Sequence, residues 1–573
     1  MIYKGNPVSQ GIGIGKIHLF EPFVPSVVKN VIVPGDRSKT IESYEKAKEK
    51  AQEEILAVRK KLMAGDKEKA KIFSAHMEIL SDPVIDEEIR ISIAQDCLNA
   101  DWVIYSTYEK YIGILEKTQD MLIRERAADI KDVQLRLLRC FYGLPEKSLA
   151  SIKTPVIIVA HDLLPSDTVM LDPANTLAIV TEIGGYTSHS AIIARNLEIP
   201  ALLGVQEAVS IVKQSETVIV DALDGLLITE PEKEQMESYH KKREDFIMHT
   251  AEVKKFMDIK AVTADGFPVE IDLNISSADL LELEGAQFTD GVGLFRTEFL
   301  YMGRSHLPTE EEQYEIYKKV LLKFGSRPVT LRTLDIGGDK TLEYLQLPKE
   351  DNPFLGNRAL RLCFQNPDIF KTQLRAALRA SIHGNLRIMF PMVANMEDIY
   401  KAKAVLGEVK AGLDKEEIPF DKNVKIGIMI EIPSIALIAD FVVKEVDFAS
   451  IGTNDLTQYM IAVDRLNPNV TEYYQAYHPA IFRMIGFVIE QFVKEGKPIC
   501  VCGEMGGDVL SAVVLLGMGI RQLSMGISSV GRIKKMINSL AVGQAGSIAA
   551  NLKNYVTAAG MEEYLKSSLA DIL

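Results

Sequence analysis

The sequence predicts a multidomain α/β protein whose carboxyl-terminal part is a (β/α)8 barrel of the TIM type. The chain has 573 residues, which is enough for several domains with sizeable cores. From Ala261 to the carboxyl end, eight short apolar runs alternate with stretches of helical periodicity. Polar residues follow most of these runs directly, as they do where the strands of such a barrel end at an active site. A doubly wound sheet is the alternative arrangement.

The composition is typical of a globular protein and argues against several other classes. The formal charge is −14 and 47% of the residues are hydrophobic, which is ordinary for a globular protein and argues against a nucleic-acid binder. No apolar run is long enough to cross a membrane, and the first 20 residues lack the layout of a signal peptide. We therefore expect a cytoplasmic protein without membrane insertion. The five cysteines are scattered and odd in number, so no disulfide framework is predicted.

The chain begins with a strand and then becomes helical. Residues 11–16 predict a turn that leads into an edge strand at 17–20, and not a dinucleotide-binding loop, because no helix follows. Residues 21–145 predict an inserted helical subdomain, because apolar residues recur there at helical spacing. Helices are expected from about residue 38 and over 67–79, 84–94, 100–115 and 119–138. The exposed faces of this subdomain suit either a structural cap or a docking surface.

Residues 146–230, together with residues 1–20, predict a small α/β domain. Its expected strands are the apolar runs at 156–159, 177–180, 201–203, 218–220 and 226–228. Residues 231–260 are charged and contain no glycine, which predicts a linker helix. Residues 261–573 then form the barrel, with strands expected at 269–273, 292–295, 329–334, 386–390, 426–430, 448–451, 499–501 and 522–525.

His189 is the candidate reactive residue of the α/β domain. Two glycines at 184–185 follow an apolar run, and Thr187 and Ser188 then offer side-chain oxygens that can cap a helix start. The backbone N–H groups and the helix dipole favour negative charge at that end of a helix. An imidazole in this place suits a phosphoryl group. A capping or core histidine is the simpler alternative.

Polar residues at the ends of the barrel strands predict a second part of the site. They are Asn274, Arg296, Arg332 with Asp335, Glu431, Asn454 with Asp455, and Cys502, while Arg358 and Arg465 lie in loops that follow strands. Arginines bind phosphate and carboxylate oxygens at two points, and Glu431 and Asp455 are hard oxygen ligands that suit Mg²⁺. The expected ligand is therefore a small phosphorylated acid. For any single arginine, a surface ion pair is the alternative.

Several motifs resemble those of Enzyme I of the bacterial sugar phosphotransferase system, the phosphoenolpyruvate-protein phosphotransferase family. The resemblance runs the full length of the chain. It is carried by Gly184-Gly185 with Thr187-Ser188-His189, and by 297–302 (TEFLYM), 307–313 (LPTEEEQ), 333–340 (TLDIGGDK), 352–356 (NPFLG), 452–458 (GTNDLTQ) and 502–505 (CGEM). Pyruvate phosphate dikinase and phosphoenolpyruvate synthase look similar in parts, but both carry a large ATP-binding domain for which no residues are left here.

The resemblance implies a role for each site residue. His189 would be phosphorylated at Nε2, and Thr168 would orient it. Cys502 would protonate the enolate carbon to give pyruvate. The phosphoenolpyruvate contacts would be Arg296, Arg332, Arg358, Asn454, Asp455 and Arg465, and the Mg²⁺ ligands would be Glu431 and Asp455. The helical subdomain would dock HPr, the carrier protein that takes the phosphoryl group, and the barrel would form a homodimer.

Two residues depart from the family pattern. Tyr186 stands where an arginine is usual, which bears on the charge balance of the phosphohistidine, and Asn357 stands where an aromatic residue is common. Because His189 has to reach both the substrate and the acceptor protein, we predict a swivel of the α/β domain, with hinges near 149–155 and 227–231 and a bend along the linker. A catalytically silent phosphoenolpyruvate-binding regulatory protein is the main rival. An aldolase or lyase on the same barrel leaves His189 unexplained.

Overall fold

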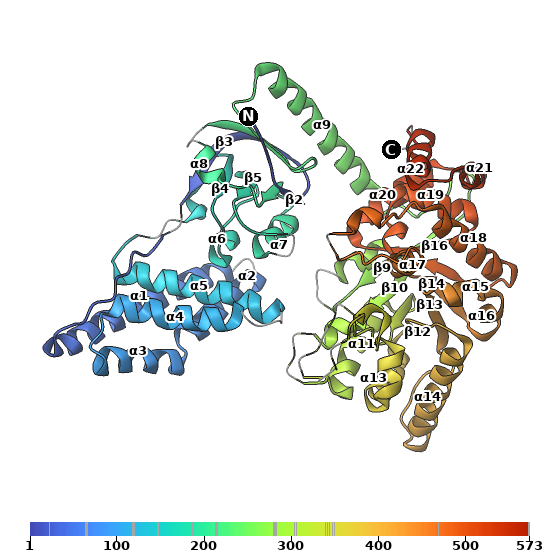
Figure 1. Cartoon of the computed structure of the whole chain (residues 1–573), viewed down its shortest axis with the longest axis horizontal. Helices are drawn as coiled ribbons and strands as arrows, with labels where there is room; N and C mark the ends of the chain where they lie inside the picture. The colour runs from blue at the N-terminus through green and yellow to red at the C-terminus, as the bar shows by residue number, and fades with distance from the viewer. Residues whose placement is uncertain are drawn as a thin grey trace. The chain divides into compact units, whose positions relative to one another are not determined.

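The computed structural model describes two compact units, Met1–His249 and Thr250–Leu573, each of which is treated by itself (Figure 1). The described residues are 1–21, 23–63, 67–116, 121–145, 148–185, 188–212, 216–278, 283–302, 304, 306–338, 340, 342, 344–345, 348, 350–467 and 469–570. Within these ranges, no helix has both the length and the apolar character that a membrane span requires.

The first unit is built around one mixed sheet of eight strands in the order β1-β8-β7-β3-β4-β5-β6-β2. The strands are β1 (Ile2–Lys4), β2 (Asn6–Ser9), β3 (Ile12–Phe20), β4 (Val156–Ala160), β5 (Thr176–Thr181), β6 (Ala201–Leu203), β7 (Thr217–Asp221) and β8 (Leu226–Thr229). β3 pairs in parallel with β4 and antiparallel with β7. The expected edge strand is therefore wrong, because residues 12–16 extend it and β7 covers its outer side.

Side chains of β4 alternate between two apolar layers, as a strand buried on both faces requires. Ile158 packs in one layer with Ala191 and Ala194, whereas Ile157 and Val159 pack in the other. Ala191 and Ala194 belong to α7 (His189–Asn196), which thus lies against the sheet. The short helices α6 (Pro165–Val169) and α8 (Ala208–Ile211) complete this part of the unit.

Within the described residues, a bundle of α-helices makes up most of the rest of the first unit. They are α1 (Arg37–Met63), α2 (Lys67–Leu80), α3 (Pro83–Gln95), α4 (Ala100–Glu116) and α5 (Met121–Phe141), close to the ranges expected from periodicity. Their shared core includes Ile55, Phe73 and Ile89, which are fully buried. α3 begins where Asp82 accepts hydrogen bonds from the backbone nitrogens of the first turn and Pro83 occupies the first helical position.

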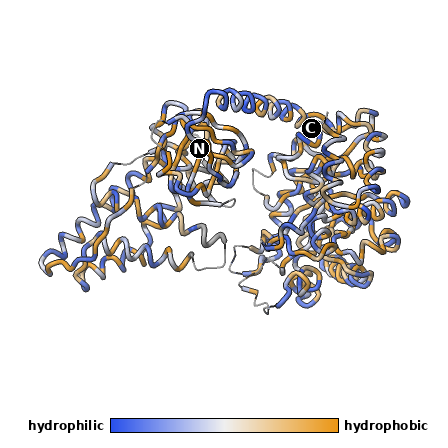
Figure 2. The backbone as a smooth tube through the Cα atoms, turned by 45° about the horizontal axis from the view of Figure 1, so that its top comes forward, coloured by the Kyte–Doolittle hydropathy of each residue, from blue (hydrophilic) through white to orange (hydrophobic). Residues whose placement is uncertain are grey.

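The linker is one helix, α9 (Lys233–Lys255), and Figure 2 shows it largely in hydrophilic colours. Its first half is held by the first unit: Lys242 Nζ lies 2.5 Å from Asp221 Oδ2 and 2.6 Å from Asp224 Oδ2, and Tyr239 packs on an apolar cluster. Its end belongs to the second unit, where Glu252 pairs with Lys535 at 3.0 Å.

The second unit is a closed barrel of eight parallel strands, β10-β11-β12-β13-β14-β15-β16-β9, which confirms the expected fold. The strands are β9 (Glu270–Ile275), β10 (Gly291–Arg296), β11 (Pro328–Arg332), β12 (Asn385–Phe390), β13 (Lys425–Ile430), β14 (Phe448–Ile451), β15 (Ile499–Val501) and β16 (Gln522–Met525). Each expected apolar run is one of these strands. The carboxyl ends of all eight therefore meet at one mouth.

Helices surround the barrel (Figure 1). They are α11 (Glu310–Phe324), α12 (Leu360–Gln365), α13 (Pro367–Ala380), α14 (Met396–Lys415), α15 (Pro433–Leu437), α16 (Ala439–Glu445), α17 (Thr453–Met460), α18 (Pro479–Lys494), α19 (Val509–Met518), α20 (Ile527–Ser539), α21 (Val542–Asn551) and α22 (Ala558–Ser568). One continuous apolar core joins strands and helices and includes Val292, Phe370 and Ile485.

Candidate active site

A polar pocket of about 470 Å³ opens at the carboxyl ends of the barrel strands. Its lining contains Arg296, Arg332, Arg358, Glu431, Asn454, Asp455, Arg465 and Cys502, which the sequence predicted at the strand ends and in the loops that follow. Asn274, predicted with them, lines the neighbouring cavity that shares Arg296 and Cys502. The polar pocket also contains Glu298, Asp335, Lys340 and Glu504. Of these four, Glu298, Lys340 and Glu504 carried no assigned role from the sequence, and only their place within recognised motifs could have pointed to them.

Arg332 is neutralised by carboxylates. Its Nη2 donates to Glu298 Oε1 at 2.5 Å, and its Nη1 lies 3.1 Å from Asp335 Oδ2. Lys340 Nζ donates to the same Glu298 oxygen at 2.6 Å. Glu298 is fully buried, and burial alone would raise its pKa, but Arg332 and Lys340 hold the pKa below its ordinary value. Glu298 therefore stays charged in the wall of the pocket.

Arg358 is neutralised in the same way. Its Nε and Nη2 donate to the two oxygens of Asp335 at 2.9 and 3.0 Å, and its Nη1 reaches Asp455 Oδ1 at 3.3 Å. Burial would raise the pKa of Asp335, but Arg332 and Arg358 lower it strongly. Gly337 must be glycine here, because its φ is +112° and a Cβ would lie 2.8 Å from the Arg358 Cα.

The other two arginines are free to bind an anion. Within the described part of the chain, neither the Arg296 guanidinium nor that of Arg465 forms an ion pair, although both line the pocket. The positive charge that remains for a ligand therefore belongs to Arg296 and Arg465.

Glu431 is a buried carboxyl group whose pKa is strongly raised. It is fully buried; its Oε1 accepts a hydrogen bond from the Met392 backbone nitrogen at 2.6 Å, while Oε2 has no partner among the described residues. Burial, and then the charges of Asp455 and Asp335, raise the pKa of Glu431 to about 8. Gly452 leaves room for this oxygen, since a Cβ there would lie 2.9 Å from it.

Two neighbouring carboxylates with an unpartnered oxygen, those of Glu431 and Asp455, fit a divalent cation. Within the described ranges, this pocket included, no group of three or more His, Cys, Asp or Glu residues is placed to hold a metal ion, so the protein would supply only two ligands here.

Cys502 lies just after β15 and is buried among Leu294, Met389 and Met429. Its backbone nitrogen donates to the Ile451 carbonyl at 3.2 Å, and its own carbonyl accepts from Asn274 Nδ2 at 2.9 Å. Burial raises the pKa of the Cys502 thiol to about 11, so the sulfur carries its proton at neutral pH.

The amide of Asn454 is already engaged within the protein. Its Nδ2 donates to Glu504 Oε1 at 2.9 Å, and its Oδ1 accepts from the Glu504 backbone nitrogen at 3.0 Å. A direct contact of Asn454 with a ligand therefore has to share or replace these bonds.

His189 is the first residue of α7, in the first unit. Ser188 caps the helix, its Oγ accepting from the Ala191 nitrogen at 3.3 Å. Tyr186, Thr187 and the side chain of His189 lie outside the described residues, so their predicted contacts are untested. Thr168 is fully buried, and its Oγ1 donates to the Pro165 carbonyl at 2.9 Å.

A second histidine, which no sequence motif had indicated, lies near the segment that leads to this helix. His161 follows β4, and its Nδ1 lies 2.6 Å from Glu182 Oε2, directly after β5. The backbone of His161 also accepts a hydrogen bond from Ile183 at 3.2 Å, one residue before the glycine turn. The carboxyl edge of this sheet thus holds an imidazole–carboxylate pair beside the His189 segment.

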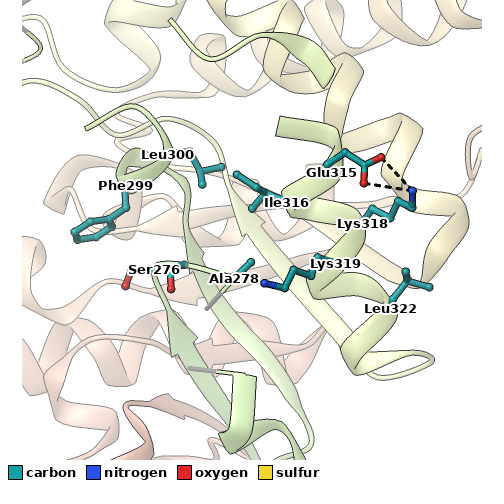
Figure 3. A pocket seen from close by; sticks show the side chains of 10 residues that line it. Ser276, Ala278, Phe299, Leu300, Glu315, Ile316, Lys318, Lys319 and Leu322 are labelled. Atoms are coloured by element: carbon teal, nitrogen blue, oxygen red, sulfur yellow. Dashed lines mark hydrogen bonds and ion pairs between the residues drawn. The ribbon is translucent and has the colours of Figure 1, made fainter. Parts of the chain in front are cut away.

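A second pocket of the barrel unit, about 540 Å³, lies outside the charged site (Figure 3). It is lined mainly by Phe299, Leu300, Ile316 and Leu322, with Glu315 and Lys318 paired at 3.1 Å on its rim. None of the predicted site residues lines it.

Comparison with known proteins identifies the family of the chain. Three family models match in chain order: the N-terminal domain of PEP-utilising enzymes at 4–126, their mobile domain at 152–225 and their PEP-binding domain at 250–542. The phosphoenolpyruvate-protein phosphotransferases of Listeria innocua and Bacillus subtilis are 43% and 42% identical over 569 residues, covering 99% of each chain. A solution structure of an Enzyme I protein is 36% identical over 43% of this chain and 99% of its own, with a TM-score of 0.39. By this full-length similarity, the chain belongs to the phosphoenolpyruvate-protein phosphotransferase family.

Proposed function

We propose that the protein transfers the phosphoryl group of phosphoenolpyruvate to Nε2 of its own His189 and then to a histidine of HPr, releasing pyruvate. This is the first step of the sugar phosphotransferase system. The observation that carries the proposal is the barrel pocket, which combines two arginines that form no ion pair among the described residues, two carboxyl groups and a protonated thiol. An aldolase or lyase has no use for the histidine segment.

The charges of the pocket divide the arginines into two roles. Arg296 and Arg465 would bind the phosphate and carboxylate of the substrate, because no carboxylate neutralises them within the described residues. Arg332 and Arg358 would add to the field while Glu298 and Asp335 hold their guanidinium planes in place. Asn454 and Asp455 would complete the binding set. Phosphoryl transfer depends mainly on such positioning and charge stabilisation.

Glu431 and Asp455 would hold Mg²⁺, which would neutralise charge on the phosphate. The unpartnered Oε2 of Glu431 and its raised pKa support this assignment, because a cation would relieve the repulsion between the two carboxylates. Waters and substrate oxygens would supply the remaining ligands, as is usual for this ion.

Cys502 would act as the acid. Loss of the phosphoryl group leaves an enolate, and a thiol that keeps its proton at neutral pH can deliver it to the methylene carbon. His189 would be the nucleophile, and its place at the start of α7 favours the negative phosphoryl group. Thr168 would orient it, although its hydroxyl is engaged with Pro165 here.

We retain the domain division expected from the sequence: an α/β domain (1–20 and 146–230), a helical HPr-binding subdomain (21–145), a linker (231–260) and a barrel (261–573). Exposed apolar side chains on α3 and α4, namely Val84, Ile91 and Ile114, support docking of a carrier protein. Leu437 and Phe441, exposed on α15 and α16, would serve a homodimer through the barrel.

The swivel would bend α9 between its two anchored ends. Lys242 ties one side to Asp221, and Glu252 ties the other to Lys535, so the flexible stretch would be 243–251. Hydrogen exchange should show less protection there than at 233–242. Uniform protection along α9 would rule out this hinge.

Labelling with ³²P-phosphoenolpyruvate tests the function. With Mg²⁺, the full chain should gain acid-labile, base-stable label that HPr removes, and His189→Ala should gain none. A folded protein that binds phosphoenolpyruvate but takes no label would instead be the catalytically silent regulatory protein.

A further inference from the structure

The proton donor Cys502 lies where two neighbouring strands of the barrel have their shortest pairing. Every other pair of neighbouring strands shares at least three register pairs, whereas β15 and β16 share one, Val501 with Leu523. Cys502 follows this single pair directly. On the β14 side, its backbone nitrogen bonds Ile451, but the ladder to β16 ends before it. Some other group must hold its carbonyl.

Asn274 supplies that bond from two strands away. It lies on β9, and its side chain crosses β16 to donate from Nδ2 to the Cys502 carbonyl at 2.9 Å. On the way it is held by β16: Ser524 Oγ donates to Asn274 Oδ1 at 2.6 Å. Ser524 is fully buried, so its hydroxyl has no competing water. Asn274 Nδ2 also donates to the Ser524 carbonyl at 3.4 Å, so the amide has one orientation, with its oxygen toward the Ser524 hydroxyl and its nitrogen toward the two carbonyls.

Two glycines lie next to the residues of this hydrogen-bond chain. Gly293 leaves room for the Ser524 hydroxyl, and Gly503 follows Cys502 directly. A Cβ at Gly293 on β10 would lie 2.5 Å from Ser524 Oγ, so any side chain there would displace the hydroxyl from Asn274. A Cβ at Gly503 would lie 1.9 Å from Thr453 Oγ1, so the residue after Cys502 has to be glycine. Glycine loosens the backbone next to the thiol, and that backbone then needs an external restraint.

We propose that Asn274, held by Ser524, is a positioning residue for the proton donor Cys502, and that it sets the face of the enolate to which the proton is delivered. The inference rests on the proposed function. In this step the S–H bond of Cys502 breaks and a C–H bond forms at C3 of the enolate, whose oxygen becomes the ketone of pyruvate. The thiolate regains a proton from water after the product leaves.

The surroundings of Cys502 explain why the orientation of its thiol is important. A cavity of about 760 Å³, lined by Asn274, Cys502 and Ser528, opens beside the thiol. Water in that cavity can protonate an enolate from either side when the thiol is misplaced. An acid in the correct place contributes about 10²–10⁴-fold to a rate, which is lost when its geometry is lost.

The test is the stereochemistry of the new methyl group. The full-length protein, Mg²⁺ and HPr are given phosphoenolpyruvate that carries tritium in one position at C3, in D₂O. The wild type should yield pyruvate with one methyl configuration. Asn274→Ala should yield a mixture and lower kcat by about 10–100-fold, with KM for phosphoenolpyruvate changed less than about threefold. A residue that only supports the fold would not convert a single configuration into a mixture.

Matched variants separate the outcomes. Ser524→Ala should give part of the same loss, and Ser528→Ala, in the same cavity, should match the wild type. If Asn274→Ala does not fold, the methyl configuration and kcat of Ser524→Ala test the inference instead. A folded Asn274→Ala or Ser524→Ala with one configuration and wild-type kcat would overturn the inference. A wild type that forms no pyruvate would instead refute the proposed function.

Discussion

Arg332 donates to Glu298 at 2.5 Å inside the barrel, and the carboxylate that receives it is fully buried. Lys340 shares the same oxygen at 2.6 Å. The pocket thus contains a carboxylate whose task is to hold two cations and not to bind the anionic substrate.

Glu298→Gln should destabilise the barrel unit. The change keeps the size of the side chain but leaves Arg332 and Lys340 without their shared counter-charge. Breaking one partner of a buried ion pair costs about 3–5 kcal/mol. Urea unfolding followed by circular dichroism measures the loss, and Glu315→Gln, which removes an exposed pair with Lys318, is the matched control with less than about 1 kcal/mol. Equal stability of the two variants would contradict the account.

Arg296→Ala should weaken substrate binding without unfolding the protein, because no carboxylate depends on it within the described residues. Loss of charge-assisted hydrogen bonds predicts a rise of about 10–100-fold in the Kd for phosphoenolpyruvate, measured by calorimetry. Arg332→Ala should differ, since it removes one of the two cations that neutralise each of the buried carboxylates Glu298 and Asp335, and so lowers the melting temperature. Identical melting curves for both variants would refute the division of roles.

Mg²⁺ should raise the melting temperature of the wild type, because an ion that binds only the folded state stabilises it. Glu431→Gln and Asp455→Asn should each remove most of this shift. Glu504→Gln is the control, since this carboxylate lines the same pocket but is bonded to Asn454. A full Mg²⁺ shift in Glu431→Gln would exclude that residue as a ligand.

The stability of the barrel unit should depend on pH because of Asp272. It is buried in the barrel, and burial raises its pKa to about 7. A raised folded-state pKa means that its stabilising contribution is complete below the unfolded value of about 3.9 and is lost as the pH rises through 7. Asp272→Asn should therefore become more stable than the wild type by roughly 2–4 kcal/mol at pH 8. Chemical denaturation from pH 5 to pH 8 checks this, and a pH-independent difference would contradict it.

The periodicity of apolar residues was sufficient to predict the eight barrel strands and the helices of the inserted subdomain. Local patterns carry this information, because burial on one or both faces repeats with the period of the element. The edge strand at 17–20 was wrong for the opposite reason. Whether another strand covers β3 depends on β7, which lies some 200 residues further along the chain, and no local pattern records that pairing.

From the sequence alone came the fold class, the family resemblance and the identity of the polar residues at the strand ends, because motifs and periodicity are local properties. Only the tertiary structure decided which of those residues are partners of one another. It paired Arg332 with Glu298 and Arg358 with Asp335, left Arg296 and Arg465 without an ion pair among the described residues, and brought Asn274 to the carbonyl of Cys502 across β16. These contacts join residues separated by tens to hundreds of positions, so they exist only once the barrel has closed.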